Sequence, residues 1–79
     1  MQRRSNNESL AILADQYGMD PWSLVQAYAN ESVVPAICTS LDCQGEYSEE
    51  LESDCDGGFC NFCGQPNTMV SCMVLAGVI

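Results

Sequence analysis

Two closely spaced cysteine pairs are the residues of this chain best suited to chemistry. Four residues separate Cys38 from Cys43, two separate Cys60 from Cys63, and sixteen lie between the pairs. Each pair can offer two sulfur atoms to one ion at about 2.3 Å, and the linker can bring both together as a tetrahedron. We therefore predict a Zn²⁺ ion bound by four thiolates. The alternatives are two disulfides, or reduced thiols without a metal.

Glycines follow both cysteine pairs, as Gly45 and Gly64. A metal-binding loop must turn back sharply, and glycine tolerates the positive φ that such a turn often needs. The two remaining cysteines, Cys55 and Cys72, lie outside these glycine-ended pairs. They are free thiols, one disulfide, or substitute ligands. Cys72 lies in an apolar run and is most simply a core residue, whereas Cys55 lies in a polar segment and is the better candidate for a substitute ligand.

Catalytic chemistry is not indicated by these residues. The chain has no His to activate a cysteine nucleophile. The pair Cys60 and Cys63 has redox spacing, but we see no βαβ context that would place it at a helix N-terminus. A zinc ion with four sulfur ligands is closed and leaves no position for water. We expect a protein that is not an enzyme.

The formal charge is −9, from eleven acidic and two basic residues. A nucleic-acid binder needs basic residues to neutralise phosphates, and both arginines here lie within the first four residues. Direct nucleic-acid binding is therefore not expected. Seven acidic residues lie close together in the middle of the chain: Asp42, Glu46, Glu49, Glu50, Glu52, Asp54 and Asp56. This run is either a solvated loop or an interaction surface, with Glu49, Glu50 and Glu52 as its centre.

The termini give an expectation about location. The polar start carries no secretion signal, and the apolar tail, residues 69–79, is shorter than the roughly 20 residues that a membrane helix needs. We expect a cytoplasmic protein with no membrane contact. In that reducing compartment, clustered cysteines bind metal more often than they cross-link.

Two helices are expected near the N-terminus, after a disordered lead over residues 1–7. Asn6 or Asn7 would cap the first helix, and Gly18 would end it. Asp20 and Pro21 suit the start of a second helix, from about 21 to 30. The short link between them predicts a helical hairpin over residues 8–31. Its Trp22 is either a core residue or, if exposed, an anchor for a protein partner.

The rest of the chain, residues 32–79, is expected to form a zinc ribbon with three short strands, packed with the helices as one small α+β domain. Residues 33–37 form a strand that Pro35 restricts to an edge. Residues 45–48 form a returning strand, and 49–58 an acidic connector. Residues 68–79 are apolar on both faces, which indicates a long central strand.

Several of these stretches also occur in a known group of proteins. The run Val34–Cys38, the two cysteine loops with Phe59 before the second, and the ending Val74–Ile79 resemble small zinc-ribbon proteins encoded by phages and prophages. The resemblance covers residues 33–79 and implies a zinc ribbon in the cytoplasm of a host cell, with no activity assigned. This chain departs from the group in two ways. It has Phe59 in place of the usual Trp, and it has two additional cysteines, Cys55 and Cys72.

Two functions follow as hypotheses. The first is a zinc-stabilised interaction module that binds a host or phage protein. The second is an acidic, DNA-mimic inhibitor of a nucleic-acid enzyme. The sequence does not identify the partner, the biological process or the oligomeric state.

Overall fold

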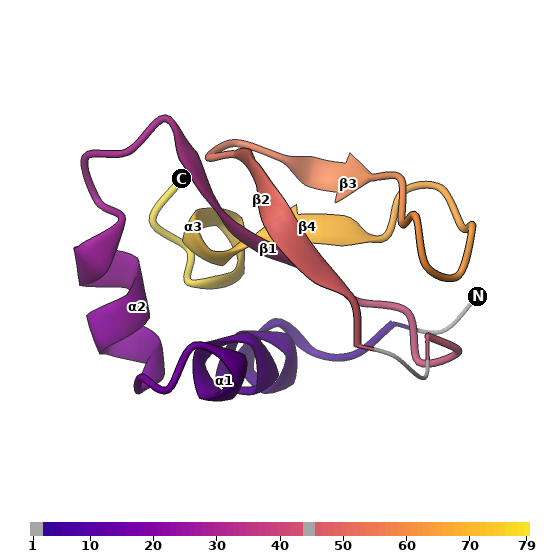
Figure 1. Cartoon of the computed structure of the whole chain (residues 1–79), viewed down its shortest axis with the longest axis horizontal. Helices are drawn as coiled ribbons and strands as arrows, with labels where there is room; N and C mark the ends of the chain where they lie inside the picture. Colours follow the sequence, from indigo (N-terminus) through magenta and orange to yellow (C-terminus); the bar gives the residue numbers. More distant parts are fainter. Residues whose placement is uncertain (1–2, 44–45) are drawn as a thin grey trace.

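A four-stranded antiparallel sheet forms the centre of the structure, a computed structural model that describes residues 3–43 and 46–79. The strand order is β2-β1-β4-β3 (Figure 1). The α+β class is therefore as expected, with four strands in place of three. The elements are α1 Asn6–Gln16, α2 Pro21–Ala27, β1 Val33–Cys38, β2 Ser48–Glu52, β3 Asp56–Gly58, β4 Met69–Ser71 and α3 Cys72–Leu75.

Residues 3–5, before α1, are part of the fold rather than of the disordered lead that we expected over residues 1–7, whose first two residues lie outside the described part of the chain. Arg4 donates its backbone N–H to the carbonyl of Thr39 at 2.7 Å, and Arg3 pairs with Ser40. The cap of α1 is Ser5, not Asn6 or Asn7, and its hydroxyl accepts from the N–H of Glu8 at 3.1 Å. Serine and asparagine are both good caps. The contacts of Arg3 and Arg4 with residues 39–40 fix where the helix begins, and this makes Ser5 the cap.

The second helix begins as predicted, with Asp20 as its cap and Pro21 in its first turn. It ends at Ala27, three residues before the expected end. The helical hairpin is only partly present, because α2 turns away from the direction of α1 instead of folding back along it (Figure 1). Trp22 is 62% exposed, so its interpretation as a core residue is wrong.

Strand β1 is central, although Pro35 predicted an edge. Within β1, backbone N–H groups alternate in direction. Cys38 donates toward β2, to Tyr47, and Thr39 donates toward the segment before β4. By this alternation the backbone nitrogen of Pro35 falls on the β4 side, where the pairing of β1 with β4 ends at Ala36 and Ser71. The next residue, Cys72, already belongs to α3, so the missing N–H of Pro35 interrupts no hydrogen bond between β1 and β4.

The acidic segment 49–58 is not a connector, because most of it forms strands. Glu49, Glu50 and Glu52 lie on β2, which pairs with β1, and Asp56 begins β3. The expected strand at 45–48 is represented only by Ser48, the first residue of β2. Gly45 lies outside the described residues. The β-strand propensity of Glu is low, so the partner strand β1 decides this conformation.

Strand β4 is central, as predicted, but it ends at Ser71. The Ser71 hydroxyl accepts from the N–H of Val74 at 3.2 Å and so caps α3. It also donates to the carbonyl of Ser53 at 2.6 Å, between β2 and β3. The predicted long strand over 68–79 is therefore a three-residue strand followed by a short helix. Within the described ranges, no helix is long and apolar enough to cross a bilayer.

Two clusters of buried residues lie on either side of the sheet. The larger joins the three helices to β1 and β4, and includes Leu13, Leu24 and Ile37. The smaller contains Cys38, Met69 and further cysteines, with Leu51 packed against it. The sheet thus separates a helix-packed core from a cysteine-rich cluster.

Candidate metal centre

The four predicted cysteines meet at one point. The Sγ atoms of Cys38, Cys43, Cys60 and Cys63 all lie within 4.8 Å of one another. The Cys38–Cys63 pair is 3.8 Å apart and the Cys43–Cys60 pair 3.9 Å. Sulfur atoms placed tetrahedrally at 2.3 Å from one ion would be about 3.8 Å apart, whereas a disulfide is about 2.05 Å long. The group therefore has the spacing of a four-sulfur metal site.

The first cysteine loop joins the end of β1 to a tight turn. Cys38 is the last residue of β1, and a turn then brings Cys43 back toward it. In that turn, Ser40 accepts the N–H of Cys43 at its carbonyl (3.2 Å) and the N–H of Asp42 at its hydroxyl (3.2 Å). These two hydrogen bonds close the turn and so place both sulfur atoms on the same side.

The second cysteine loop turns back at Gly64, as predicted. Gly64 has φ +75° and donates its N–H to the carbonyl of Cys60 at 2.9 Å. The N–H of Cys63 points at Cys60 Sγ, 3.4 Å away. Burial alone would raise the pKa of Cys60, but the N–H groups of Cys63 and Phe62 outweigh it and the pKa is lowered. This loop therefore stabilises a thiolate.

Cys38 lies deeper, and its surroundings have the opposite effect. Its side chain is fully buried, and this burial raises the pKa of the thiol to about 12. Without a metal, Cys38 therefore holds its proton at neutral pH. A cation that binds here must displace that proton, so metal binding weakens as the pH falls.

Both arginines of the chain are fixed to the first cysteine loop. Arg4 is buried, and its guanidinium donates to the carbonyls of Cys38 (2.7 Å) and Ser40 (3.1 Å). Arg3 donates from Nε to the hydroxyl of Thr39 at 3.0 Å. Sequence reasoning missed this role and treated the arginines as part of a disordered lead. Two adjacent arginines in a chain with no other basic residue were the available signal.

Cys55 and Cys72 are outside the four-sulfur group, and both are free thiols. Cys72 is fully buried in the larger core, as expected, and burial raises its pKa. The thiol of Cys55 is half-buried and lies 3.6 Å from the carbonyl of Met69. The structure therefore gives neither residue the place of a substitute ligand.

The predicted interaction residues lie elsewhere. Trp22 is on α2, at the opposite end of the molecule from the cysteine loops (Figure 1). Glu49, Glu50 and Glu52 are on β2. Comparisons with protein-family models, with curated proteins and with solved structures gave no match.

Proposed function

We propose that this chain is a non-enzymatic, zinc-stabilised module that binds another protein. The mutual spacing of the four Sγ atoms is the observation that carries the proposal. Thiolate ligands in a tetrahedral arrangement favour Zn²⁺ among the common divalent ions. With four sulfur ligands the ion is closed to substrate, and its role is then to stabilise the fold.

A structural ion suits a chain of this size. A domain of 79 residues has a small core, and such domains usually need a further source of stability. Binding of zinc to thiolates contributes about 10 kcal/mol or more, comparable with the whole stability of many domains. Here the ion would join the end of β1 to the loop between β3 and β4.

Exposed aromatic residues on the second cysteine loop support binding to a protein. Phe59 and Phe62 flank Cys60 and are 56% and 61% exposed. Aromatic side chains are enriched in protein interfaces. Phe62 also stacks on Tyr47, with ring centroids 6.4 Å apart. Zinc would therefore hold this surface in place. By the resemblance described above, the partner would be a host or phage protein.

Affinity capture from the producing cell tests this function. The tagged, zinc-loaded protein is the bait, and Cys60→Ala is the matched variant that lacks one ligand. We expect a partner that the zinc-loaded bait retains and Cys60→Ala loses. Trp22→Ala and Phe62→Ala baits then locate the surface. Equal retention by the wild type and Cys60→Ala would contradict a zinc-stabilised interaction module.

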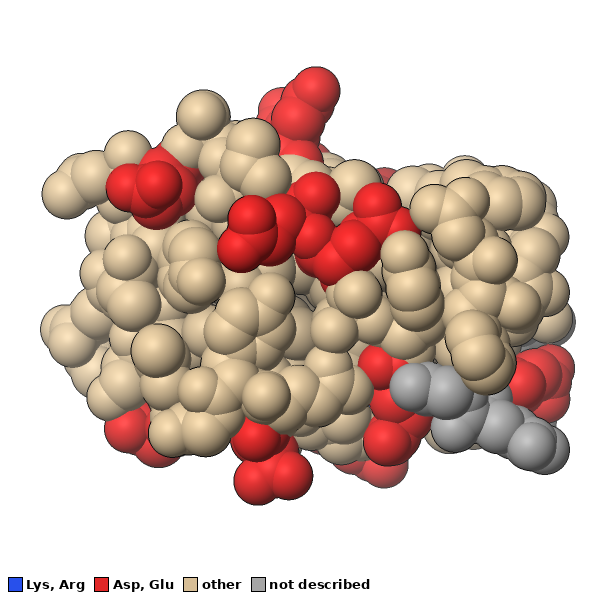
Figure 2. Space-filling model, in the orientation of Figure 1, with Lys and Arg blue, Asp and Glu red and all other residues tan. Residues whose placement is uncertain are grey.

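The acidic strand β2 supports a second candidate, a DNA-mimic inhibitor. Figure 2 shows a group of acidic side chains over β2, and among the described residues no basic side chain is visible in this view. Three of the five residues of β2 are glutamates: Glu49, Glu50 and Glu52. Several negative charges close together can attract the basic groove of a nucleic-acid enzyme. Such binding would weaken steeply with salt, whereas apolar binding would not.

Replacing the three glutamates of β2 with Gln separates the two candidates. As a DNA mimic, the wild type would inhibit at least one of a panel of purified nucleases and RNA polymerases at low salt. The triple variant would keep its fold and zinc but lose this inhibition. The matched control removes three charges elsewhere, at Glu8, Asp15 and Glu31. Equal inhibition by wild type and triple variant, or none by either, would exclude the DNA-mimic function.

A further inference from the structure

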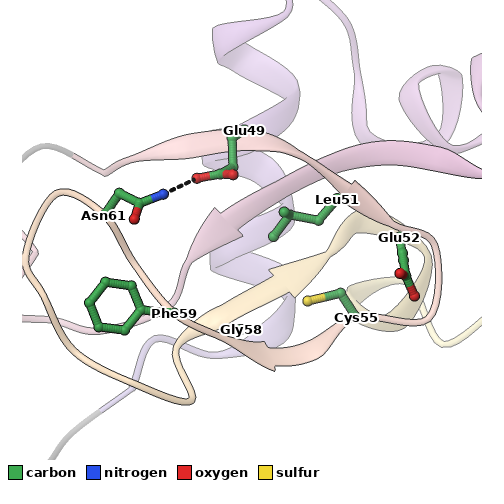
Figure 3. A pocket seen from close by; sticks show the side chains of 7 residues that line it. All are labelled: Glu49, Leu51, Glu52, Cys55, Gly58, Phe59 and Asn61. Atoms are coloured by element: carbon green, nitrogen blue, oxygen red, sulfur yellow. Dashed lines mark hydrogen bonds between the residues drawn. The ribbon is translucent and has the colours of Figure 1, made fainter.

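An open groove lies on the face of the sheet opposite the helices (Figure 3). It has a volume of about 430 Å³, within the range of ligand-binding pockets. Strand β2 forms one side, and the end of β3 with the start of the second cysteine loop forms the other. Its lining residues are Glu49, Leu51, Glu52, Cys55, Gly58, Phe59 and Asn61.

The floor of the groove is apolar. Leu51 and Cys55 point into the space between the two sides (Figure 3). A Cβ atom built on Gly58 would lie 3.1 Å from Cys55 Sγ and 3.7 Å from a methyl carbon of Leu51. The absence of a side chain at Gly58 therefore lets the two sides approach while the floor stays open. Phe59 adds an exposed aromatic wall at one end.

The rim of the groove is acidic. Glu49 is half-buried and accepts a hydrogen bond from the Asn61 amide at 3.1 Å, which fixes its carboxylate at one end. Glu52 is exposed at the other end (Figure 3). The only basic residues, Arg3 and Arg4, are held at the first cysteine loop. Within residues 3–43 and 46–79, no basic side chain neutralises this rim, and a bound group can do so.

An apolar floor between two carboxylates complements an aliphatic side chain with cationic neighbours. We propose that this groove binds a short peptide segment of a partner protein, with one aliphatic residue against Leu51 and flanking Lys or Arg residues at Glu49 and Glu52. This inference rests on the proposed interaction module and specifies its partner. A second copy of this chain is a poor occupant, because its charge is −9 and like charges repel.

Selection from a library of displayed random eight-residue peptides tests the proposal. The zinc-loaded protein is the target at low salt. We expect enrichment of sequences in which Leu, Ile or Val adjoins Lys or Arg. No enrichment, or enrichment of neutral or acidic sequences, would overturn the proposal.

Charge variants then test the rim with the most enriched peptide, made synthetically. Glu49→Gln with Glu52→Gln should weaken its binding by about threefold to tenfold, because two charge pairs at the surface are lost. The matched control, Glu8→Gln with Asp15→Asn, removes the same charge from α1 and should change the affinity less than twofold. If both double variants weaken peptide binding equally, the peptide is attracted only by the net charge of the protein. That result would overturn the proposal that it binds in the groove.

Alkylation of Cys55 gives a readout inside the groove. Cys72 is fully buried and zinc protects the four ligands, so iodoacetamide should modify Cys55 first. Bound peptide should slow this reaction at least fivefold. A peptide that binds without protecting Cys55 uses another surface; that result overturns the groove but leaves the interaction module intact. If removal of zinc unfolds the protein and the peptide still binds, that result would instead contradict the proposed zinc-stabilised interaction module.

Discussion

At the scale of single residues, Arg4 is the least expected feature of the candidate metal centre. Its guanidinium is buried, and its hydrogen bonds go to carbonyl oxygens rather than to a carboxylate. A buried charge without a counter-charge is unfavourable. Four thiolates with one Zn²⁺ carry a net charge of −2, and this group would provide the missing counter-charge beside Cys38.

Replacing Arg4 with Met should therefore weaken zinc binding by about tenfold or more, because hydrogen bonds from a charged donor are worth about 1.5–3 kcal/mol. Competition with a chromophoric chelator measures this affinity. Arg3→Gln is the matched control, since Arg3 makes one bond to an uncharged hydroxyl, and should change zinc affinity little. Equal zinc affinities for Arg4→Met and the wild type would show that Arg4 does not support the site.

Cys72 gives a residue-scale prediction about pH. Burial raises its folded pKa above the unfolded value, which is about 8.5. The stability contributed by the neutral thiol is thus complete below pH 8.5 and is lost as the pH rises toward the folded pKa. Cys72→Ala should cost about 1 kcal/mol near pH 7, and this difference should shrink above pH 9. Urea unfolding at several pH values measures it, and a constant difference would contradict the burial argument.

At the scale of elements, the second cysteine loop depends on the conformation of Gly64. Its φ is +75°, and a Cβ built there meets no atom within 4 Å. Gly64→Ala should therefore destabilise the zinc-loaded protein by about 1 kcal/mol through backbone strain alone. Gly64→Asn should cost less, because Asn tolerates this conformation. Thermal unfolding compares them; a larger loss for Asn than for Ala would show that side-chain space, not φ, is limiting.

Elements governed by neighbouring residues were predictable from the sequence. The start of α2 follows from Asp20 and Pro21, and the turn at Gly64 follows from a local need for positive φ. The meeting of four cysteines follows from the spacing of two short loops.

Elements governed by distant partners were not predictable in this way. The acidic residues of β2 form a strand because β1 lies beside them. Pro35 is accepted in a central strand because β4 ends opposite it. Ser71 ends β4 because its hydroxyl caps α3 and bonds to Ser53, a contact between residues far apart in the sequence. The contacts of Arg4 with the first cysteine loop are of the same kind.

At the scale of the whole molecule, stability comes from two places. The helices pack on one side of the sheet around Leu13, Leu24 and Ile37. The opposite side holds the acidic groove and the smaller cluster, in which Ala36, Met69 and Leu51 pack with the cysteines. Zinc would reinforce this small cluster and hold Phe59, which lines the groove, beside the ligand Cys60. The proposed metal site and the proposed binding surface would thus be parts of one arrangement.

Zinc content measured together with folding tests this account most directly. Native mass spectrometry of protein purified without chelator should find one Zn²⁺ per chain. Stepwise chelation in reductant, followed by circular dichroism, should unfold the chain in proportion to the zinc removed, because the unfolded chain has no preformed site. A metal-free, reduced sample that still unfolds cooperatively on heating would contradict the zinc-stabilised fold.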